Sequence, residues 1–422
     1  MHVRPIAIAA SLLLAAPTLA DTINVPADHP TIQGAVDAAN DGDEIVVAPG
    51  VYTSGGLHVV DMLGKAIVLR SSDGPERTFI DGGNTRIGRR GIICQNGETV
   101  QTSIEGFTIR NCAASWYDWN DNGEVDYWEF FGGGLWNRDG SSPTVLNCWF
   151  INNVAEYGGA ICNFDEGSNA NNPRVVDCLF QNNTAGEGVG GGIYSYASSP
   201  TVSGCTFINN TAAYGGGMIN MSGSDADVTD CSFTDNSATA DGGGLYNDSS
   251  MPIVSNCTFM NNHADDDGGA VFNADPSSNQ NIPSFNQCSF IGNHAANEGG
   301  GMHNFSVSPV IDSCEFSNNA AGDGGGILSW NGSTPRVADT PFCGNTPTDI
   351  DGNWIDEGGN TFDDACGPCD ADLDGSGHVG VDDLLLIIAA WASDDPDADL
   401  SLDGIVGVDD LLIVIAAWGE CP

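Results

Sequence analysis

One sequence motif recurs along the middle of the chain and limits the folds that the chain can adopt. Its clearest copy runs from Cys205 through Phe207 and Asn210 to the glycines at 215–217. Copies begin at seven cysteines: Cys148, Cys178, Cys205, Cys231, Cys257, Cys288 and Cys314. Three of the steps are identical, because 231 − 205, 257 − 231 and 314 − 288 all equal 26. A fixed period of this size is typical of one structural unit stacked many times.

Each unit predicts short strands and no helix. An apolar residue precedes each cysteine by three positions, and another follows the glycines, at Ile161, Ile193, Met218, Leu245, Val271, Met302 and Ile327. Cysteine and phenylalanine alternate with polar residues, which is the period of a strand. Short strands at constant spacing, without hairpin partners, predict a parallel β-solenoid whose coils lie about 4.8 Å apart.

Stacked coils would align equivalent side chains into ladders. We expect a ladder of rings in the core, formed by Phe150, Phe180, Phe207, Phe233, Phe259, Phe290 and Phe316. We also expect an amide ladder at one turn, in which each asparagine bonds to its neighbours above and below, formed by Asn153, Asn183, Asn210, Asn236, Asn262, Asn293 and Asn319. Degenerate copies extend the stack at Phe107 with Ile109 and at Thr340 with Phe342.

These residues carry a resemblance to known proteins. Gly158-Gly159-Ala160-Ile161 and Phe150-Ile151-Asn152-Asn153 match the Gly-Gly-Ala/Gly-Ile and Phe-x-x-Asn signatures of polymorphic outer-membrane adhesin repeats. More broadly, the pattern resembles right-handed parallel β-helix proteins of the pectin-lyase-like class. The resemblance implies an all-β, right-handed parallel β-helix over roughly residues 100–345. It does not choose a function, because this fold carries lyases, hydrolases, esterases, adhesins and spacers.

The sequence divides into three parts. Residues 1–20 have the charged end, apolar core and small-residue cleavage site of a secretion signal, so we expect an exported, extracellular or surface-associated protein without a membrane span. Residues 21–365 form the predicted β-helix, with the cap and first coils at 21–106 and the repeat coils at 107–345. A short amphipathic segment at 32–39 is expected to cap the first coil, because an uncapped coil exposes strand edges. Residues 366–422 are a separate module.

The charge excludes some partners. The chain has 57 acidic and 11 basic residues, for a net charge of −46, which excludes nucleic acid and anionic membranes as natural partners. This excess of negative charge favours the binding of cations, and calcium is abundant outside cells. The alternative is that the acidic surface only keeps the rod soluble.

Most of the basic residues lie near the N-terminal end of the predicted rod. A polyuronate-cleaving β-helix enzyme would need an arginine or lysine beside acids on a central coil, and none occurs between Arg174 and Arg336. The candidates for a catalytic site are therefore Asp81, Arg86, Arg89, Arg90 and Arg110. The alternative is that these arginines pair with surface acids.

An insertion at residues 115–131 fits a twelve-residue calcium loop. Such a loop has oxygen ligands at positions 1, 3 and 5, glycine at 6, an apolar residue at 8 and glutamate at 12. The predicted ligands are Asp118, Asn120, Asn122, Glu124 and Glu129. An acidic loop without an ion is the alternative. The aromatic residues around the loop are expected to pack on the rod or to form a platform for sugar rings.

A second calcium hypothesis concerns the residue that precedes the glycines. It is apolar or aromatic in the earlier coils and acidic in the later ones, at Asp241, Asp267, Glu298 and Asp323. Stacking would place these acids about 5 Å apart. Like charges at that distance repel, so a cation would lie between them or the loops would splay. Solvated loop carboxylates are the alternative.

The fourteen cysteines need two explanations. The seven ladder cysteines would lie at the coil spacing, beyond the Cβ separation of about 3.5–4.5 Å that a disulfide prefers, so we interpret them as buried free thiols. The disulfide candidates lie in the tail, Cys343 with Cys366 and Cys369 with Cys421.

The C-terminal module repeats a loop and a helix. The loops begin at Asp372 and Asp399, and 399 − 372 = 27. Each twelve-residue loop runs into an apolar helix that ends in Ala-Ala-Trp. The arrangement resembles a type I dockerin, the duplicated calcium-loop module that docks into a cohesin domain. The resemblance implies Ca²⁺ and a cohesin-like or other surface-anchor partner, with the ligands Asp372, Asp374, Ser376, His378 and Asp383 in one loop and Asp399, Ser401, Asp403, Ile405 and Asp410 in the other.

Two function classes remain open from the sequence. The first is a secreted, calcium-binding, non-catalytic rod for adhesion or polysaccharide binding, attached through the dockerin-like module. The second is a polysaccharide lyase or hydrolase carried by that module. The scarcity of basic residues on the central coils favours the first.

Overall fold

The structure is a computed structural model. It describes residues 20–83, 88–114, 127–165, 171–275, 282–363, 366, 371, 373–374, 378–393, 395–396, 398–401 and 404–420, except the side chains at 127, 128, 378 and 420. The predicted secretion signal therefore lies outside the described residues apart from residue 20. No helix among the described residues is long and apolar enough to cross a membrane.

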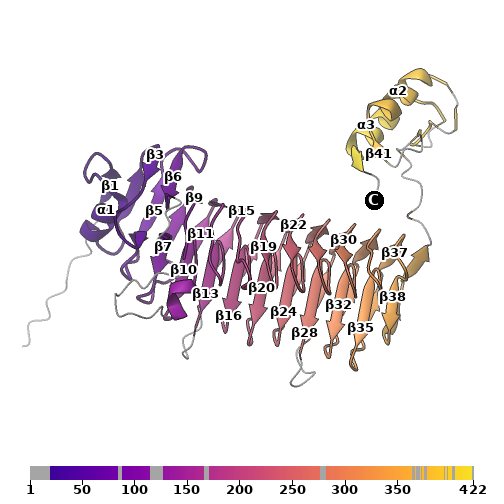
Figure 1. The fold of residues 1–422 in the computed structure, drawn as a ribbon. Coiled ribbons are helices and arrows are strands. Elements are labelled where there is room, and N and C mark those ends of the chain that lie inside the picture. The colour runs from indigo at the N-terminus through magenta and orange to yellow at the C-terminus, as the bar shows by residue number, and fades with distance from the viewer. Residues whose placement is uncertain are drawn as a thin grey trace, which may run out of the picture.

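Residues 22–363 wind into a rod of parallel coils, as the repeat predicts (Figure 1). Three long sheets run along the rod, and the strands of each pair in parallel. The first sheet contains β1 (Thr22–Val25), β2 (Glu44–Val47), β5 (Val68–Ser71), β8 (Ser103–Glu105), β11 (Thr144–Leu146), β14 (Arg174–Val176), β17 (Thr201–Ser203), β21 (Asp227–Thr229), β25 (Ile253–Ser255), β29 (Ser284–Asn286), β33 (Val310–Asp312), β36 (Arg336–Ala338) and β39 (Ile355–Gly358).

The second sheet carries the phenylalanine positions. It contains β3 (Gly50–Tyr52), β6 (Thr78–Asp81), β9 (Thr108–Arg110), β12 (Trp149–Ile151), β15 (Leu179–Gln181), β18 (Thr206–Ile208), β22 (Ser232–Thr234), β26 (Thr258–Met260), β30 (Ser289–Ile291), β34 (Glu315–Ser317), β37 (Pro341–Cys343) and β40 (Thr361–Asp363).

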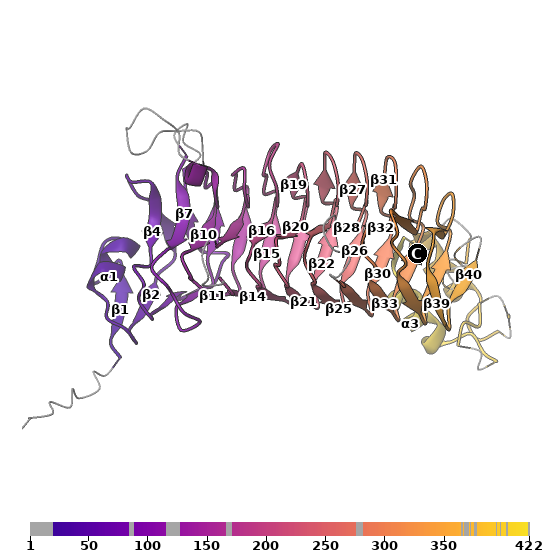
Figure 2. The same ribbon diagram turned by 90° about the horizontal axis from the view of Figure 1, so that it is seen from below.

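The third sheet follows the glycines. It contains β4 (His58–Asp61), β7 (Arg90–Cys94), β10 (Leu135–Arg138), β13 (Ile161–Phe164), β16 (Ile193–Tyr196), β20 (Met218–Met221), β24 (Leu245–Asp248), β28 (Val271–Ala274), β32 (Met302–Phe305), β35 (Ile327–Trp330) and β38 (Ile350–Gly352). A short fourth sheet precedes the glycines, formed by β19 (Thr211–Ala212), β23 (Ser237–Ala238), β27 (His263–Ala264) and β31 (His294–Ala295). Figure 2 shows β19, β27 and β31 in a row along one edge of the rod.

Both predicted ladders are confirmed. Rings stack from Phe150 to Phe362 with centroids 4.3 to 5.2 Å apart and planes within 9° of parallel. The asparagine ladder runs from Asn153 to Asn345, and each Nδ2 donates to the next Oδ1 at 2.9 to 3.0 Å. The registers also pair Ile109 with Phe150 and Phe316 with Phe342, so the two degenerate copies belong to the same stack.

The N-terminal cap is a short helix, as predicted. Helix α1 (Ile32–Ala38) begins after Thr31, whose side chain accepts a hydrogen bond from the Gly34 backbone N–H. Its residues Ile32, Ala35 and Val36 are buried in the same core that fills the coils. The helix therefore covers apolar side chains that the first coil would otherwise expose.

The seven ladder cysteines are buried free thiols, as the coil spacing predicts. Burial raises the pKa of the Cys148 thiol to about 12, so it stays neutral and packs as a small apolar group. Near the C-terminal end of the rod, Cys343 and Cys366 form a disulfide. The other proposed pair, Cys369 with Cys421, lies outside the described residues.

The described part of the C-terminal module contains two helices of equal length. Helix α2 (Val381–Ala389) and helix α3 (Val408–Ala416) share a small apolar core formed by Ala371, Val379, Ile387, Ala398, Val406 and Val414. Strands β41 (His378–Val379) and β42 (Gly419–Glu420) pair antiparallel and join the two ends of the module. A 3₁₀ helix, η1 (Tyr127–Phe130), lies near the C-terminal end of the insertion in the rod.

Candidate functional site

The residues that precede the glycines form a column along the rod. In the earlier coils, the residues that bridge from coil to coil are Phe131, Tyr157, Val189 and Tyr214. In the later coils Asp267, Glu298 and Asp323 bridge in the same way. Asp241 lies next to them, because its Oδ1 accepts the Asp267 backbone N–H at 3.2 Å. We call these four acids the acidic column.

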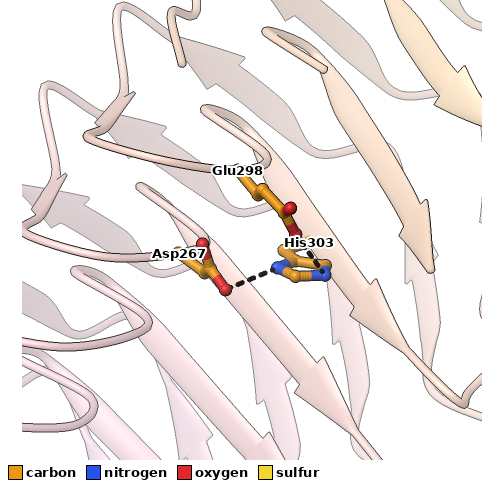
Figure 3. Close-up of side chains that lie close together, drawn as sticks. All are labelled: Asp267, Glu298 and His303. Carbon is orange, nitrogen blue, oxygen red and sulfur yellow. Dashed lines mark ion pairs between the residues drawn. The ribbon is translucent and has the colours of Figure 1, made fainter. Parts of the chain in front are cut away.

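A histidine lies beside the acidic column. His303 is the second residue of β32, and its side chain is 2% exposed. Its Nδ1 lies 3.3 Å from Asp267 Oδ2 and its Nε2 lies 3.6 Å from Glu298 Oε2 (Figure 3). Neither ring nitrogen has a hydrogen-bond partner among the described residues. The result is a buried imidazole with one carboxylate facing each nitrogen.

The close approach of the loop to this strand depends on a glycine. Gly299 follows Glu298 and has a φ of +66°, a left-handed conformation that side chains with a Cβ rarely adopt. A Cβ added at this position would lie 2.7 Å from the His303 Cβ. Glycine therefore lets the loop fold onto the strand, which brings Glu298 against the imidazole.

Two overlapping groups of side chains converge here. Asp267, Glu298 and His303 each offer one ligand atom within 4.8 Å of the others, and so do Asp241, Asp266 and Asp267. A shallow hollow opens beside them on the outside of the rod, with a volume of about 470 Å³. It is lined by Asp266, Asp267, Ala296, Asn297, Glu298, Gly322 and Asp323.

The electrostatics of the acidic column favour protons or cations. Burial raises the pKa of the Asp241 carboxyl to about 6, and the negative charges of Asp267 and Asp266 add to the effect against the opposing influence of the Asp267 backbone N–H and of His303. Burial also raises the pKa of Glu298 above its ordinary value. Carboxylates held this close repel one another unless a positive charge lies among them.

We expect Asp241 to make the metal-free rod less stable as the pH rises. Its pKa in the folded chain, about 6, exceeds the ordinary value of 3.8, so the stabilising contribution is complete below 3.8 and is lost as the pH rises through 6. In chelator, Asp241→Asn should flatten the fall in melting temperature between these pH values. Asp230→Asn, at an exposed position on the preceding coil, is the control. Equal pH profiles for Asp241→Asn and the native chain would contradict this prediction.

The predicted arginine-rich group is engaged in structural contacts. Arg110 Nε donates to Asp81 Oδ2 at 2.7 Å, and its guanidinium covers the Phe79 ring. Arg89 donates to the carbonyl oxygens of residues 56 and 82. Arg90 is buried and donates to the carbonyl oxygen of residue 131. Arg86 lies outside the described residues. The structure thus brings Asp81 and Arg110 together and directs Arg89 and Arg90 to backbone carbonyls.

Most of the insertion loop lies outside the described residues, including Asp118, Asn120, Asn122 and Glu124. Glu129, its predicted last ligand, is in η1 and is 2% exposed. The residues at 372, 376 and 403 in the C-terminal loops also lie outside the described part, and the same holds for the His378 side chain. Calcium binding by the insertion loop and by these C-terminal residues therefore stays a prediction.

The described ligands of the C-terminal loops are arranged in the same way in both halves. Asp383 accepts the backbone N–H groups of Asp374 at 3.1 Å and Gly380 at 2.7 Å. Asp410 accepts those of Ser401 at 2.8 Å and Gly407 at 2.6 Å. The Ser401 and Gly407 hydrogen bonds hold the pKa of Asp410 below its ordinary value. Asp399 accepts the N–H of residue 404, beside the predicted ligand Ile405. Each loop is therefore folded around a carboxylate that stays ionised at neutral pH.

Each C-terminal helix, together with the tryptophan that follows it, also presents exposed apolar side chains. The repeat distance of 27 relates the members of the face, since 408 − 381 = 27 and 418 − 391 = 27. In the first half it contains Val381, Leu385, Ile388 and Trp391, and in the second Val408, Leu412, Ile415 and Trp418. These residues are 45% to 59% exposed. We call this surface the duplicated face.

Comparison with known families agrees with the observed coils. The sequence matches the family described as right handed beta helix region over residues 50–212 and 178–346. The chain belongs to the right-handed β-helix family. No curated protein matches this β-helix protein.

Two solved structures are similar to this chain over most of its length. The β-helix chain is similar to the A-module of the Azotobacter vinelandii mannuronan C-5 epimerase AlgE6, at 16% identity, over 79% of this chain and 92% of that chain, with a TM-score of 0.41. It is also similar to the catalytic unit of the GH87 α-1,3-glucanase of Streptomyces thermodiastaticus, at 14% identity, over 84% of this chain and 69% of that one, with a TM-score of 0.37. A fold of this kind carries many activities.

Sequence reasoning placed the acidic column but missed His303 and Asp266. A signal for His303 existed in the repeat. Its equivalents on the neighbouring coils are Phe272 and Leu328, so a histidine replaces an apolar residue in one coil of the stack. The loops that meet this strand carry the acids, and only the observed loop path shows that they reach it.

Proposed function

We propose that this β-helix protein is an exported, non-catalytic binding rod attached to a protein partner through its dockerin-like C-terminal module. The observation that carries the proposal is the duplicated face, because eight large apolar side chains are exposed on two short helices and at the tryptophans that follow them. Exposed apolar patches of this kind mark interaction sites. The partner supported by the resemblance to dockerins is a cohesin-like surface-anchor domain.

Calcium is the ion that suits the loops of this module. Their described side-chain donors, Asp374, Asp383, Asp399, Ser401 and Asp410, all offer oxygen. Hard cations such as Ca²⁺ take six to eight oxygen ligands. When bound, the ion would neutralise the carboxylates that fold each loop. The chain's own contribution is to hold α2 and α3 so that their apolar residues face outward.

The duplication predicts how docking responds to substitution. Either half presents the same residues, so Leu385→Asp or Leu412→Asp alone should weaken binding about twofold, by removing one of two equivalent sites. The double variant should lose binding more than about a hundredfold, because a charge in a desolvated patch is costly. Binding of the full chain to recombinant cohesin domains in calcium, followed by surface plasmon resonance, measures this.

Controls separate docking from folding. Ile253→Asp alters an apolar residue on the rod that is 56% exposed, and it should leave the affinity unchanged. Circular dichroism in calcium should show that the double variant keeps its helices. If the double variant binds as well as the native chain, the duplicated face is not the docking surface. If the native chain binds no cohesin domain, the partner assignment is wrong.

Polysaccharide binding by the rod is a second candidate function. It is favoured by aromatic side chains that cluster on the outer face of the third sheet, next to the acidic column. The rings of Tyr214 and Tyr246 lie 5.6 Å apart, and Tyr214 is 39% exposed. Partly exposed rings offer flat apolar surface with a polar edge. Retention of the native chain on immobilised polysaccharides, and its loss in Tyr214→Ala, tests this role.

The same incubations with polysaccharide also test whether the protein is an enzyme. Release of new chain ends from a polysaccharide would contradict the non-catalytic proposal. If that release disappeared in an Arg89→Ala or Arg110→Ala variant that remains folded, the activity would be placed near Asp81.

A further inference from the structure

The group around His303 has a property that the acidic column alone does not explain. Calcium takes oxygen ligands, and an oxygen-only column could bind it without a histidine. Here an imidazole is buried at 2% exposure among carboxylates, and its ring nitrogens have no hydrogen-bond partner among the described residues. Burying an imidazole in this way is costly unless its nitrogens gain a partner.

The geometry points to a site for a zinc-class transition-metal ion, bound by His303 Nδ1 together with Asp267 and the neighbouring carboxylates of Asp241 and Asp266. Imidazole nitrogen mixed with carboxylate oxygen suits zinc and its neighbours in the transition series better than it suits calcium or magnesium. This site does not depend on the proposed docking function, since it lies on the rod.

The Nδ1 atom of the ring faces Asp267, and Asp267 in turn lies beside Asp241 and Asp266. Asp267 Oδ2 lies 3.3 Å from Nδ1, and Asp241, Asp266 and Asp267 offer oxygens within 4.8 Å of one another. Zinc bonds of about 2.0–2.2 Å in a tetrahedron place neighbouring ligand atoms about 3.3–3.6 Å apart. The observed separation between nitrogen and oxygen is already in that range. Asp241 and Asp266 are grouped with Asp267 and not with His303, so they would have to turn toward Nδ1 to complete the ligand set.

Glu298 has a different role. It faces the opposite nitrogen, with 3.6 Å between Glu298 Oε2 and His303 Nε2 (Figure 3). Metal-binding histidines generally donate their second N–H to a carboxylate, which fixes the tautomer and orients the ring. Glu298 is therefore a positioning residue, and Gly299 lets its loop come close enough to serve.

The site would join successive coils of the rod. Its residues come from the loop before β24, the loop before β28 and β32 itself. An ion bound by three coils opposes their separation, so binding should stabilise the rod as well as neutralise the acids. The hollow beside the acidic column leaves room for water as a further ligand.

The experiment titrates the full chain with Zn²⁺ in excess calcium, which occupies the oxygen-only loops. Isothermal titration should find a zinc site that calcium does not displace, and Co²⁺ in its place should give visible absorption from a nitrogen-containing site. His303→Gln and Asp267→Asn should abolish both signals. Glu298→Gln should weaken Zn²⁺ binding about 10–100-fold, the range for a lost outer carboxylate.

A second pair of histidines supplies the matched control. His263 and His294 stack on the neighbouring strands β27 and β31, with their Nδ1 atoms 3.2 Å apart, and His294 is exposed. If His263→Gln removes the zinc signal and His303→Gln does not, the ion binds at that surface pair and the proposed site is wrong.

Two other results would also overturn the proposal. One is the absence of a zinc site in excess calcium, which would leave His303 with only its contacts to Asp267 and Glu298. The other is displacement of Zn²⁺ by calcium at comparable concentration. The melting temperature of His303→Gln in chelator shows whether that variant is folded. If it is not, Glu298→Gln with the Co²⁺ spectrum still decides, because an unchanged affinity and spectrum would contradict the assigned role.

Discussion

Removing calcium should unfold the C-terminal module while the rod remains intact. The module's apolar core is small, with only six buried apolar residues in its described part. Domains of this size bury little surface and are marginally stable alone. An ion present at a hundred times its dissociation constant contributes about 2.7 kcal/mol, so two loops contribute about 5 kcal/mol. That is comparable with the whole stability of a small domain.

Hydrogen exchange measures this prediction directly. In calcium, the amides of α2 and α3 should be protected, and in chelator they should exchange at nearly unfolded rates. Amides of the central coils, such as β22 and β26, should not change. Asp383→Ala and Asp410→Ala should reproduce the effect in calcium, each mainly in its own half. Asp382→Ala, at an exposed position next to Asp383, is the matched control. Protection that survives in chelator would show that calcium does not hold the module together.

Replacing one asparagine of the ladder should cost more than any surface substitution on the rod. Asn236 Nδ2 donates to Asn262 Oδ1 and to the Phe207 carbonyl oxygen, both at 3.0 Å. Its Oδ1 accepts the backbone N–H of Asn210 at 3.0 Å and the Asn210 Nδ2 at 2.9 Å. The side chain thus uses both donor hydrogens and both acceptor positions. Asn236→Leu would leave these partners buried and unsatisfied.

Each lost partner costs about 1–3 kcal/mol, so with four partners lost the variant should lose at least about 4 kcal/mol of unfolding free energy around the central coils. Denaturant unfolding, together with hydrogen exchange of β22 and β26, measures the loss and its location. The neighbouring Asp235→Asn, at an exposed position with a φ of 54°, keeps its backbone conformation and should change little. A loss below about 1 kcal/mol in Asn236→Leu would mean that water replaces the amide.

The site residues show why some positions were predictable and others were not. Asp241, Asp267, Glu298 and Asp323 occupy one repeat position, and position alone places them on neighbouring coils. The arginines do not follow the repeat. Arg90, a catalytic candidate from the sequence, proves to be a buried residue that donates to a backbone carbonyl. Its partner is 41 residues away, so local pattern could not reveal that contact.

The repeat was enough to predict the coils, their register and both ladders. It could do so because a strict repeat makes each residue meet its own equivalent at the next coil, so contacts in space follow from period alone. Contacts that depend on the path of the loops became visible only in the folded chain. Asp267 and His303 come from different coils and different repeat positions, and the left-handed Gly299 lets the Glu298 loop approach the same imidazole. No period relates such residues, and the distance between them exists only once the rod is folded.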